Sequence, residues 1–276
     1  MGKKLSKFDH RKNITAVQQR EIQSIYCYKG DRKFLNVSNV NYMYPIDDNE
    51  SDRIQENYNL YRYVWNDNFS APIKDILNSN NTQVLDIGCG PAMWTLEMAT
   101  EYPKSRFVGI DIAPTFPIRV KPNNVEFLQE NILTGLPHAD NTFDYVICRF
   151  MMFAFTTKDW EIAIKEICRV CKVGGHIEFM EKDILFWNEG NFTRKARLTC
   201  KWGGVLGENY KFIYTWGAKN LKSIMKDCGY NEREWDSVID KCMKELSEND
   251  GYDKIHRFWA QKEELLQHIE SYVIEV

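Results

Sequence analysis

The sequence contains no uninterrupted run of about 20 apolar residues, the length that a membrane-spanning helix needs. Its most apolar short stretch, Phe150 to Phe155, is bounded by Arg149. Net charge is also small, since 36 basic and 39 acidic residues leave −3, and this gives no argument for nucleic-acid binding. No linker rich in proline, glycine or serine divides the chain, and no internal repeat is found. With 43% hydrophobic residues, we expect one folded domain preceded by an N-terminal arm.

A metal centre is not expected either. The pair Cys168-x-x-Cys171 has no partner pair at zinc-finger spacing, and it falls at the end of a predicted helix. Helix-packing cysteines are therefore the favoured interpretation. The eight cysteines of the chain lie mostly inside predicted strands and helices, which favours reduced thiols and a cytoplasmic location.

The most informative feature that is present is the stretch Val84-Leu-Asp-Ile-Gly-Cys-Gly-Pro-Ala-Met-Trp94. Its apolar run Val84 to Ile87 predicts a buried strand, and a helical pattern begins directly afterwards at Met93. Gly88 and Gly90 form the turn between them, where the absence of a Cβ lets the backbone approach a ligand closely. This order of elements predicts a ligand-binding turn.

A second strand completes the signal. Arg106-Phe-Val-Gly-Ile-Asp111 reads as a buried strand that ends in an acid. The acid lies about 20 residues past the glycine turn, where a carboxylate can hold ribose hydroxyls. Together the two strands and the turn predict a nucleoside-binding βαβ unit.

The residues around the turn distinguish between nucleoside cofactors. A dinucleotide fingerprint would require glycine at position 93, where the chain has Met93. Asp86, just before the turn, would repel a diphosphate but suits a ligand with an amino group and a sulfonium. The pattern therefore favours S-adenosylmethionine over NAD, and an NAD-dependent oxidoreductase is the disfavoured alternative.

Residues 84–181 resemble a class I S-adenosylmethionine-dependent methyltransferase. Upstream, Tyr44 to Arg53 resembles a fungal branch of that family, which includes secondary-metabolism regulators. The resemblance implies an α/β, Rossmann-like three-layer sandwich with a mostly parallel sheet and an antiparallel final strand. It is carried by four segments in the family's order and spacing: Val84–Ala92, Gly109–Asp111, Leu136–Val146 and Arg169–Gly175.

The resemblance also implies roles for residues. The glycine turn would contact the methionine end of the cofactor, and Asp111 its ribose. Asn131 replaces the family's adenine-contacting acid and can still accept a hydrogen bond, while Ala92 replaces the third family glycine. Arg149 would lie where the methyl-donor end and the acceptor meet. The full set expected at the cofactor is Asp86, Gly88, Cys89, Gly90, Asp111, Ile112, Asn131, Ile132 and Arg149.

The acceptor side is less defined. Phe150, Met152 and Phe153 follow the fourth predicted strand, where the cleft should open, and together with Tyr44 they are expected to line an acceptor pocket. Ordinary core packing is an equal alternative for them. Glu181, directly after the fifth strand, is the candidate general base, with a surface acid as the other interpretation. The acceptor atom is not readable, and a small molecule is favoured over a protein side chain.

The organisation expected along the chain is a flexible basic arm over residues 1–40 and a methyltransferase domain over 41–276. Within that domain, residues 41–80 form a helical lid and residues 182–276 a variable C-terminal part. Acids between Asp47 and Asp52 favour the start of the lid helix. The further elements expected are strands at 125–129, 143–148 and 175–180, a helix from 156, helices at 218–228 and 232–246, and a final strand at 255–260.

Met1-Gly-Lys-Lys-Leu-Ser6 fits the N-myristoylation pattern with Gly2 as the acceptor. Neighbouring lysines and arginines could supply the second signal for peripheral membrane contact, and an unmodified tail is the alternative. The leading hypothesis is a methyltransferase acting on a small molecule. The second is a catalytically silent, cofactor-binding interaction protein tethered at a membrane, which Asn131 and Ala92 would permit.

Overall fold

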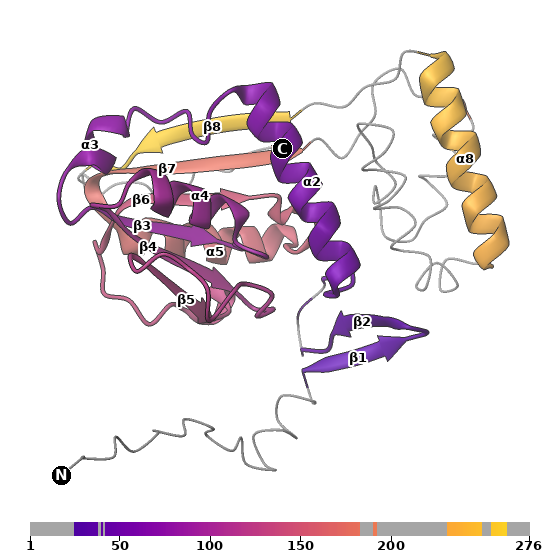
Figure 1. Cartoon of the computed structure of the whole chain (residues 1–276), viewed down its shortest axis with the longest axis horizontal. Coiled ribbons are helices and arrows are strands. Elements are labelled where there is room, and N and C mark those ends of the chain that lie inside the picture. The colour runs from indigo at the N-terminus through magenta and orange to yellow at the C-terminus, as the bar shows by residue number, and fades with distance from the viewer. Residues whose placement is uncertain are drawn as a thin grey trace, which may run out of the picture.

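The chain is described by a computed structural model over residues 25–37, 40, 42–182, 190–191, 231–249 and 255–263 (Figure 1). Its centre is a six-stranded sheet with the order β5-β4-β3-β6-β7-β8. Neighbouring strands from β5 to β7 run parallel, and β8 pairs antiparallel with β7. The predicted fold class, with its antiparallel final strand, is confirmed. The strands are β3 (Gln83–Ile87), β4 (Arg106–Asp111), β5 (Val125–Gln129), β6 (Phe143–Arg149), β7 (Cys171–Lys182) and β8 (Ile255–Gln261).

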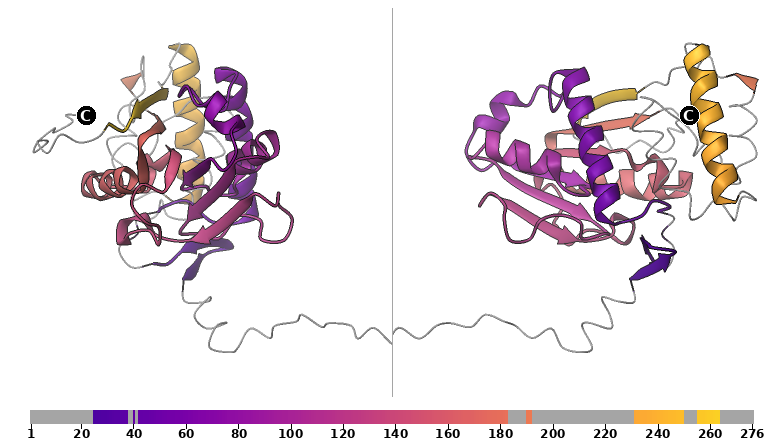
Figure 2. Two further views of the ribbon diagram at one scale, coloured as in Figure 1. Left: turned by 90° about the vertical axis from the view of Figure 1, so that its left-hand side faces the viewer. Right: turned by 45° about the vertical axis from the view of Figure 1, so that its right-hand side comes forward.

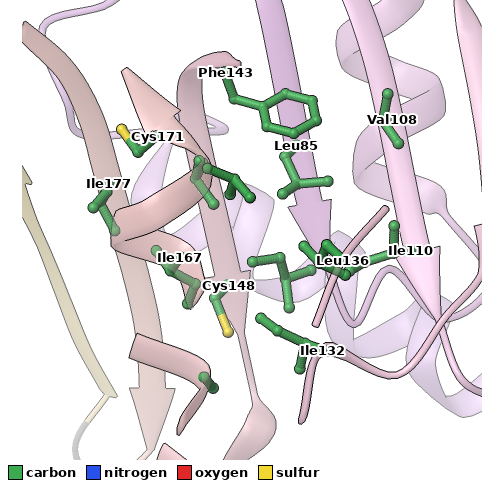
Figure 3. Close-up of a cluster of buried hydrophobic side chains, with 14 residues drawn as sticks. Leu85, Val108, Ile110, Ile132, Leu136, Phe143, Cys148, Ile167, Cys171 and Ile177 are labelled. Carbon is green, nitrogen blue, oxygen red and sulfur yellow. The ribbon is translucent and has the colours of Figure 1, made fainter. Parts of the chain in front are cut away.

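Helices cover both faces of the sheet because successive side chains of a buried strand point to opposite faces. On one face, Val84 and Tyr145 pack against Trp94 and Met98 of α4 (Met93–Glu101). On the other, alternate residues of the same strands pack against α5 (Thr157–Val170), as Figure 3 shows. The result is a three-layer sandwich. The second cluster includes Leu85, Ile87, Val108, Ile110, Val146, Cys148, Ala163 and Ile167.

Helix α5 begins at the predicted capping box. The Thr156 hydroxyl accepts from the Asp159 N–H at 3.3 Å, and the Asp159 carboxylate accepts from the Thr156 N–H at 2.9 Å. Such reciprocal bonds satisfy two backbone donors that a helix start leaves open. Cys171, expected on the buried stripe of this helix, is already the first residue of β7.

The expectation of an irregular arm through residue 40 is wrong for residues 26–35. These form an antiparallel hairpin of β1 (Tyr26–Lys29) and β2 (Arg32–Leu35). The two-residue turn between the strands holds Gly30 at φ +64°, a conformation glycine adopts readily. Phe34 anchors the hairpin, because its ring is buried in a cluster with Tyr44 and residues of α8 (Glu232–Glu248). Gly2 and the helix predicted at 218–228 lie outside the described residues.

Helix α2 (Asp48–Trp65) begins at the predicted acidic cluster. The Asp47 carboxylate accepts from the Glu50 N–H at 3.1 Å and from the Arg32 guanidinium of β2 at 2.8 Å. Both α2 and α8 lie toward the carboxyl ends of the parallel strands (Figures 1 and 2). The short helix α3 (Lys74–Asn78) lies near the opposite end, before β3. Within the described ranges, no helix combines the length and apolar character needed to cross a bilayer.

Candidate active site

The turn after β3 is built from left-handed backbone. Gly88 and Gly90 have φ values of +66° and +53°, and Ala92, the N-cap of α4, has φ +68°. A Cβ at Gly88 would lie 2.4 Å from the Met151 Sδ, so this glycine permits close packing of the loop after β6. A Cβ at Gly90 would meet no atom within 4 Å. Because Gly90 also lines a cavity, the second glycine leaves room for a ligand.

Asp111, at the end of β4, is joined directly to this turn. Its Oδ2 accepts from the Gly90 N–H at 2.8 Å, and its Oδ1 accepts from the Ala113 N–H at 2.8 Å. Removal from water raises the pKa of Asp111 to about 6, and the two backbone bonds act against that shift. Each carboxylate oxygen can accept a further bond, so ligand hydroxyls can be held at this point.

A cavity opens where β3, β4 and β6 end, and α2 and α8 contribute to its walls. Most of the side chains expected at the site line it, whereas Asp86, Met152 and Glu181 are not among its lining residues. Met93, the residue that argued against NAD, also lines the cavity. The expected residues that the structure gathers there are Tyr44, Gly88, Cys89, Gly90, Asp111, Ile112, Asn131, Ile132, Arg149, Phe150 and Phe153.

Asp86 lies beneath the cavity rather than on its surface. Its Oδ2 accepts from the Thr95 hydroxyl at 2.6 Å and lies 3.6 Å from Arg149 Nη2. Arg149 is held over the Trp94 ring at 5.1 Å. Burial raises the pKa of Asp86, and the nearby guanidinium opposes this.

Two buried atoms of this pair have no hydrogen-bond partner among the described residues, Oδ1 of Asp86 and Nε of Arg149. Buried polar atoms are normally satisfied, so a ligand group or ordered water is expected beside them. An ammonium and a carboxylate would match an acid and a guanidinium in sign. The residues therefore fit the amino-acid end of S-adenosylmethionine.

Asn131, predicted to contact adenine, lines the cavity and already has one protein partner. Its side-chain oxygen accepts from the Leu133 N–H at 3.0 Å and caps the short helix η1 (Ile132–Thr134), and an amide oxygen can accept a second bond. Glu130, which was not predicted, also lines the cavity. An acid next to Asn131 was a readable signal for this second polar group.

The loop after β6 reaches across the cavity toward α2. Phe150, at φ +56°, stacks on Tyr61 of α2 with ring centroids 5.1 Å apart. Phe153, in the short helix η2 (Met151–Phe153), meets Tyr44 edge-on at 5.8 Å. Both phenylalanines therefore lie at the cavity, as expected, while Met152 points its backbone N–H to Glu181.

Glu181, the candidate general base, does not line the cavity. Its carboxylate accepts from the backbone N–H groups of Met151 at 2.8 Å and Met152 at 3.2 Å. Removal from water raises the pKa of Glu181 to about 7. The geometry supports a positioning role, in which Glu181 fixes the loop that packs on Gly88.

The variant Glu181→Gln is expected to change how stability depends on pH. The raised pKa of about 7, against 4.5 ordinarily, means that ionisation of this carboxyl disfavours the folded state. The neutral Glu181 carboxyl therefore contributes fully to the free energy of unfolding below about pH 4.5. This contribution is lost as the pH rises through 7. The unfolding free energy of the wild type relative to the variant should therefore fall by about 3 kcal/mol between these limits. Urea denaturation at each pH measures this, and a constant difference would contradict the assignment.

Glu178, on β7, is the largest omission of the sequence analysis. Its side chain is fully buried and accepts from the backbone N–H groups of Ser70 and Ala71, the latter at 2.8 Å. It also accepts from the Tyr145 hydroxyl at 3.0 Å and from Arg257 Nε of β8 at 2.7 Å. The only sequence signal was an acid within an apolar strand.

Two contacts fix the C-terminal half of α2 over the site. Glu97 of α4 accepts from Arg62 Nε at 3.0 Å and from Asn68 Nδ2 at 2.8 Å, and it also bonds the Tyr58 hydroxyl. Arg257 lies over the Trp65 ring at 5.4 Å. The cavity-facing side of this helix is therefore held in place by the sheet and by α4.

The sequence is similar to those of known methyltransferases. Residues 84–175 match the family profile described as a methyltransferase domain. This match over about one third of the chain supports the resemblance to class I S-adenosylmethionine-dependent methyltransferases that its four segments carry.

Within that class, the chain resembles fungal secondary-metabolism methyltransferases. It is 31% identical to the methyltransferase pytC of Aspergillus terreus, over 59% of this chain and 49% of that protein. It is 28% identical to the secondary metabolism regulator laeA of Coprinopsis cinerea, over 55% and 38%. Identity to the N-methyltransferase sirN of Leptosphaeria maculans is 27%, over 52% and 51%. The matches thus span about half the length of these relatives, or less.

Proposed function

We propose that this chain transfers a methyl group from S-adenosylmethionine to a small-molecule acceptor. The observation that carries the proposal is the contact between Gly90 and Asp111 at the wall of the cavity. A backbone turn without a Cβ and a carboxylate are brought together there, as binding of an adenosine requires. Arg149 lines the cavity, and its Nε has no partner among the described residues, so it supplies a complementary group for the carboxylate of the amino-acid end.

When bound, S-adenosylmethionine supplies a methyl carbon on a sulfonium, and the nucleophile–carbon bond forms as the sulfur–carbon bond breaks. The remaining products are S-adenosylhomocysteine and the proton that the nucleophile loses. The protein's part is to hold both reactants in line and dry, which can lower the barrier by several kcal/mol. Phe150 and Met151 serve this purpose, because they lie between the glycine turn and α2.

The walls of the cavity favour a small molecule over a protein side chain as the acceptor. Residues 42–46, α2 and α8 all contribute to the lining beside the glycine turn. Enclosed, largely apolar pockets with few polar groups are typical of small-molecule sites.

The variant Gly90→Leu is expected to fold and to lose binding of S-adenosylhomocysteine by at least tenfold. A Cβ at Gly90 would meet no protein atom within 4 Å, so a leucine side chain could extend from it into the cavity. The matched control is Gly174→Leu, since Gly174 also has a positive φ of +77° and open space around it but does not line the cavity. Isothermal titration calorimetry measures both affinities.

Four outcomes of these binding and activity measurements would contradict the proposal or one of its parts. No heat with the wild-type protein would overturn the proposed function, and binding of NAD instead would revive the oxidoreductase alternative. Equal affinity of both variants would remove Gly90 from the site. Normal binding without methyl transfer from labelled cofactor to a broad acceptor panel would favour the silent interaction protein.

A further inference from the structure

Asn57 of α2 has a side-chain oxygen without a hydrogen-bond partner in the described part of the chain. The Oδ1 atom of Asn57 is buried and accepts no hydrogen bond from the described residues, and Asn57 lines the cavity. Leaving a buried oxygen unsatisfied costs about 1–3 kcal/mol. An unsatisfied acceptor oxygen in the wall of a binding cavity indicates that a ligand places a hydrogen-bond donor beside it.

The neighbours of Asn57 on the helix contact other protein side chains. One turn earlier, Arg53 forms two bonds with Glu50, at 2.6 and 2.9 Å. The adjacent Tyr58 bonds Glu97, and one turn later Tyr61 stacks on Phe150. Asn57 Oδ1 takes part in none of these contacts, so it is available to a ligand.

The surroundings of Asn57 across the cavity are aromatic and apolar. In addition to the ring pairs formed with Phe150 and Phe153, the ring centroids of Tyr42 and Tyr44 lie 6.2 Å apart. Burial raises the pKa of both tyrosines, so their hydroxyls stay neutral. Helix α8 closes this part with apolar residues. Those of its side chains that line the cavity are Ile239, Cys242 and Met243.

This apolar part of the cavity is adjacent to the glycine turn. Met151 packs on Gly88, and its chain neighbour Phe150 packs on Tyr61, one turn of α2 from Asn57. An acceptor placed between these aromatic side chains would thus lie next to the glycine turn and within reach of Asn57.

We propose that Asn57 is the polar anchor of the acceptor site, and that the acceptor is a flat, mostly apolar molecule with an O–H or N–H group that donates to Asn57. The inference rests on the proposed function, because it assigns the acceptor side of the same cavity. Flat rings fit between aromatic side chains, and a single hydrogen bond in an apolar pocket sets orientation.

The test uses two probes of nearly equal shape, 2-naphthol and 2-methoxynaphthalene, of which only the first can donate a hydrogen bond. Binding to protein saturated with S-adenosylhomocysteine is measured by calorimetry or ligand-detected NMR. The wild type should prefer 2-naphthol by about tenfold, the effect of one hydrogen bond in a dry site. The variant Asn57→Leu should lose this preference while keeping its affinity for S-adenosylhomocysteine.

The matched control is Asn59→Leu, because Asn59 is on the same helix but exposed. It should retain the full preference. The variant Phe153→Ala should weaken both probes equally, since it removes a ring but no hydrogen bond. Thermal unfolding of each variant establishes that it is folded.

Three results would overturn the inference. The first is binding of S-adenosylhomocysteine by the wild type with no binding of either probe. The second is a preference for 2-naphthol that survives in Asn57→Leu. The third is a loss of cofactor affinity in Asn57→Leu, which would assign Asn57 to the cofactor instead. If the wild type did not bind S-adenosylhomocysteine at all, the proposed function itself would be contradicted. This outcome is distinguishable from the three that concern Asn57.

Discussion

Asp111→Ala is expected to weaken binding of S-adenosylhomocysteine by at least 100-fold. The substitution removes the acceptor for ligand hydroxyls, and hydrogen bonds to a charged group contribute about 1.5–3 kcal/mol each. It also releases the Gly90 N–H, which the carboxylate holds at 2.8 Å, so the turn itself becomes less ordered. Calorimetric titration at pH 7.5, above the pKa of about 6, measures the loss.

The control for this variant is Asp75→Ala. Asp75 is an exposed acid in α3, near the opposite end of β3, and its removal should leave the affinity unchanged. The conservative Asp111→Asn keeps one oxygen for the Gly90 N–H and should lie between the wild type and Asp111→Ala. An affinity within threefold of the wild type for Asp111→Ala would exclude this acid from the nucleoside site.

Glu178→Ala should lower the free energy of unfolding by about 3–5 kcal/mol, the range found when one member of a buried ion pair is removed. Arg257, whose side chain is only 3% exposed, would be left as an uncompensated buried charge. The backbone N–H groups of Ser70 and Ala71 and the Tyr145 hydroxyl would lose an acceptor as well. Urea denaturation of the wild type and variant gives the difference.

Glu126→Ala is the comparison for Glu178, because Glu126 is a glutamate in a strand of the same sheet but exposed. Its effect should stay within about 0.5 kcal/mol. If Glu178→Ala lost less than 1 kcal/mol, the network around Arg257 would not hold the end of α2 to the sheet.

The residues at the start of the cavity were predictable because their signals are local. A strand that ends in glycines and a second strand that ends in Asp111 imply their meeting, since parallel strands end at one edge of a sheet. The structure places these groups in direct contact. The roles of individual polar atoms were harder to predict, because Asn131 caps a turn and Glu181 holds a loop. A hydrogen bond to the nearest backbone N–H competes with any bond to a ligand, and sequence does not show which one forms.

Short-range patterns in this chain were enough to predict the alternating strands and helices, the capping box at Thr156 and the glycine turn. Periodicity and capping act over a few residues, so they can be read without knowledge of distant neighbours. The burial of Glu178 against Arg257, 79 residues away, and the exposure of Asn57 to the cavity depend on folding. Such pairings are set by how α2, β7 and β8 pack, because an ion pair or an unsatisfied oxygen exists only once distant segments have excluded water from it.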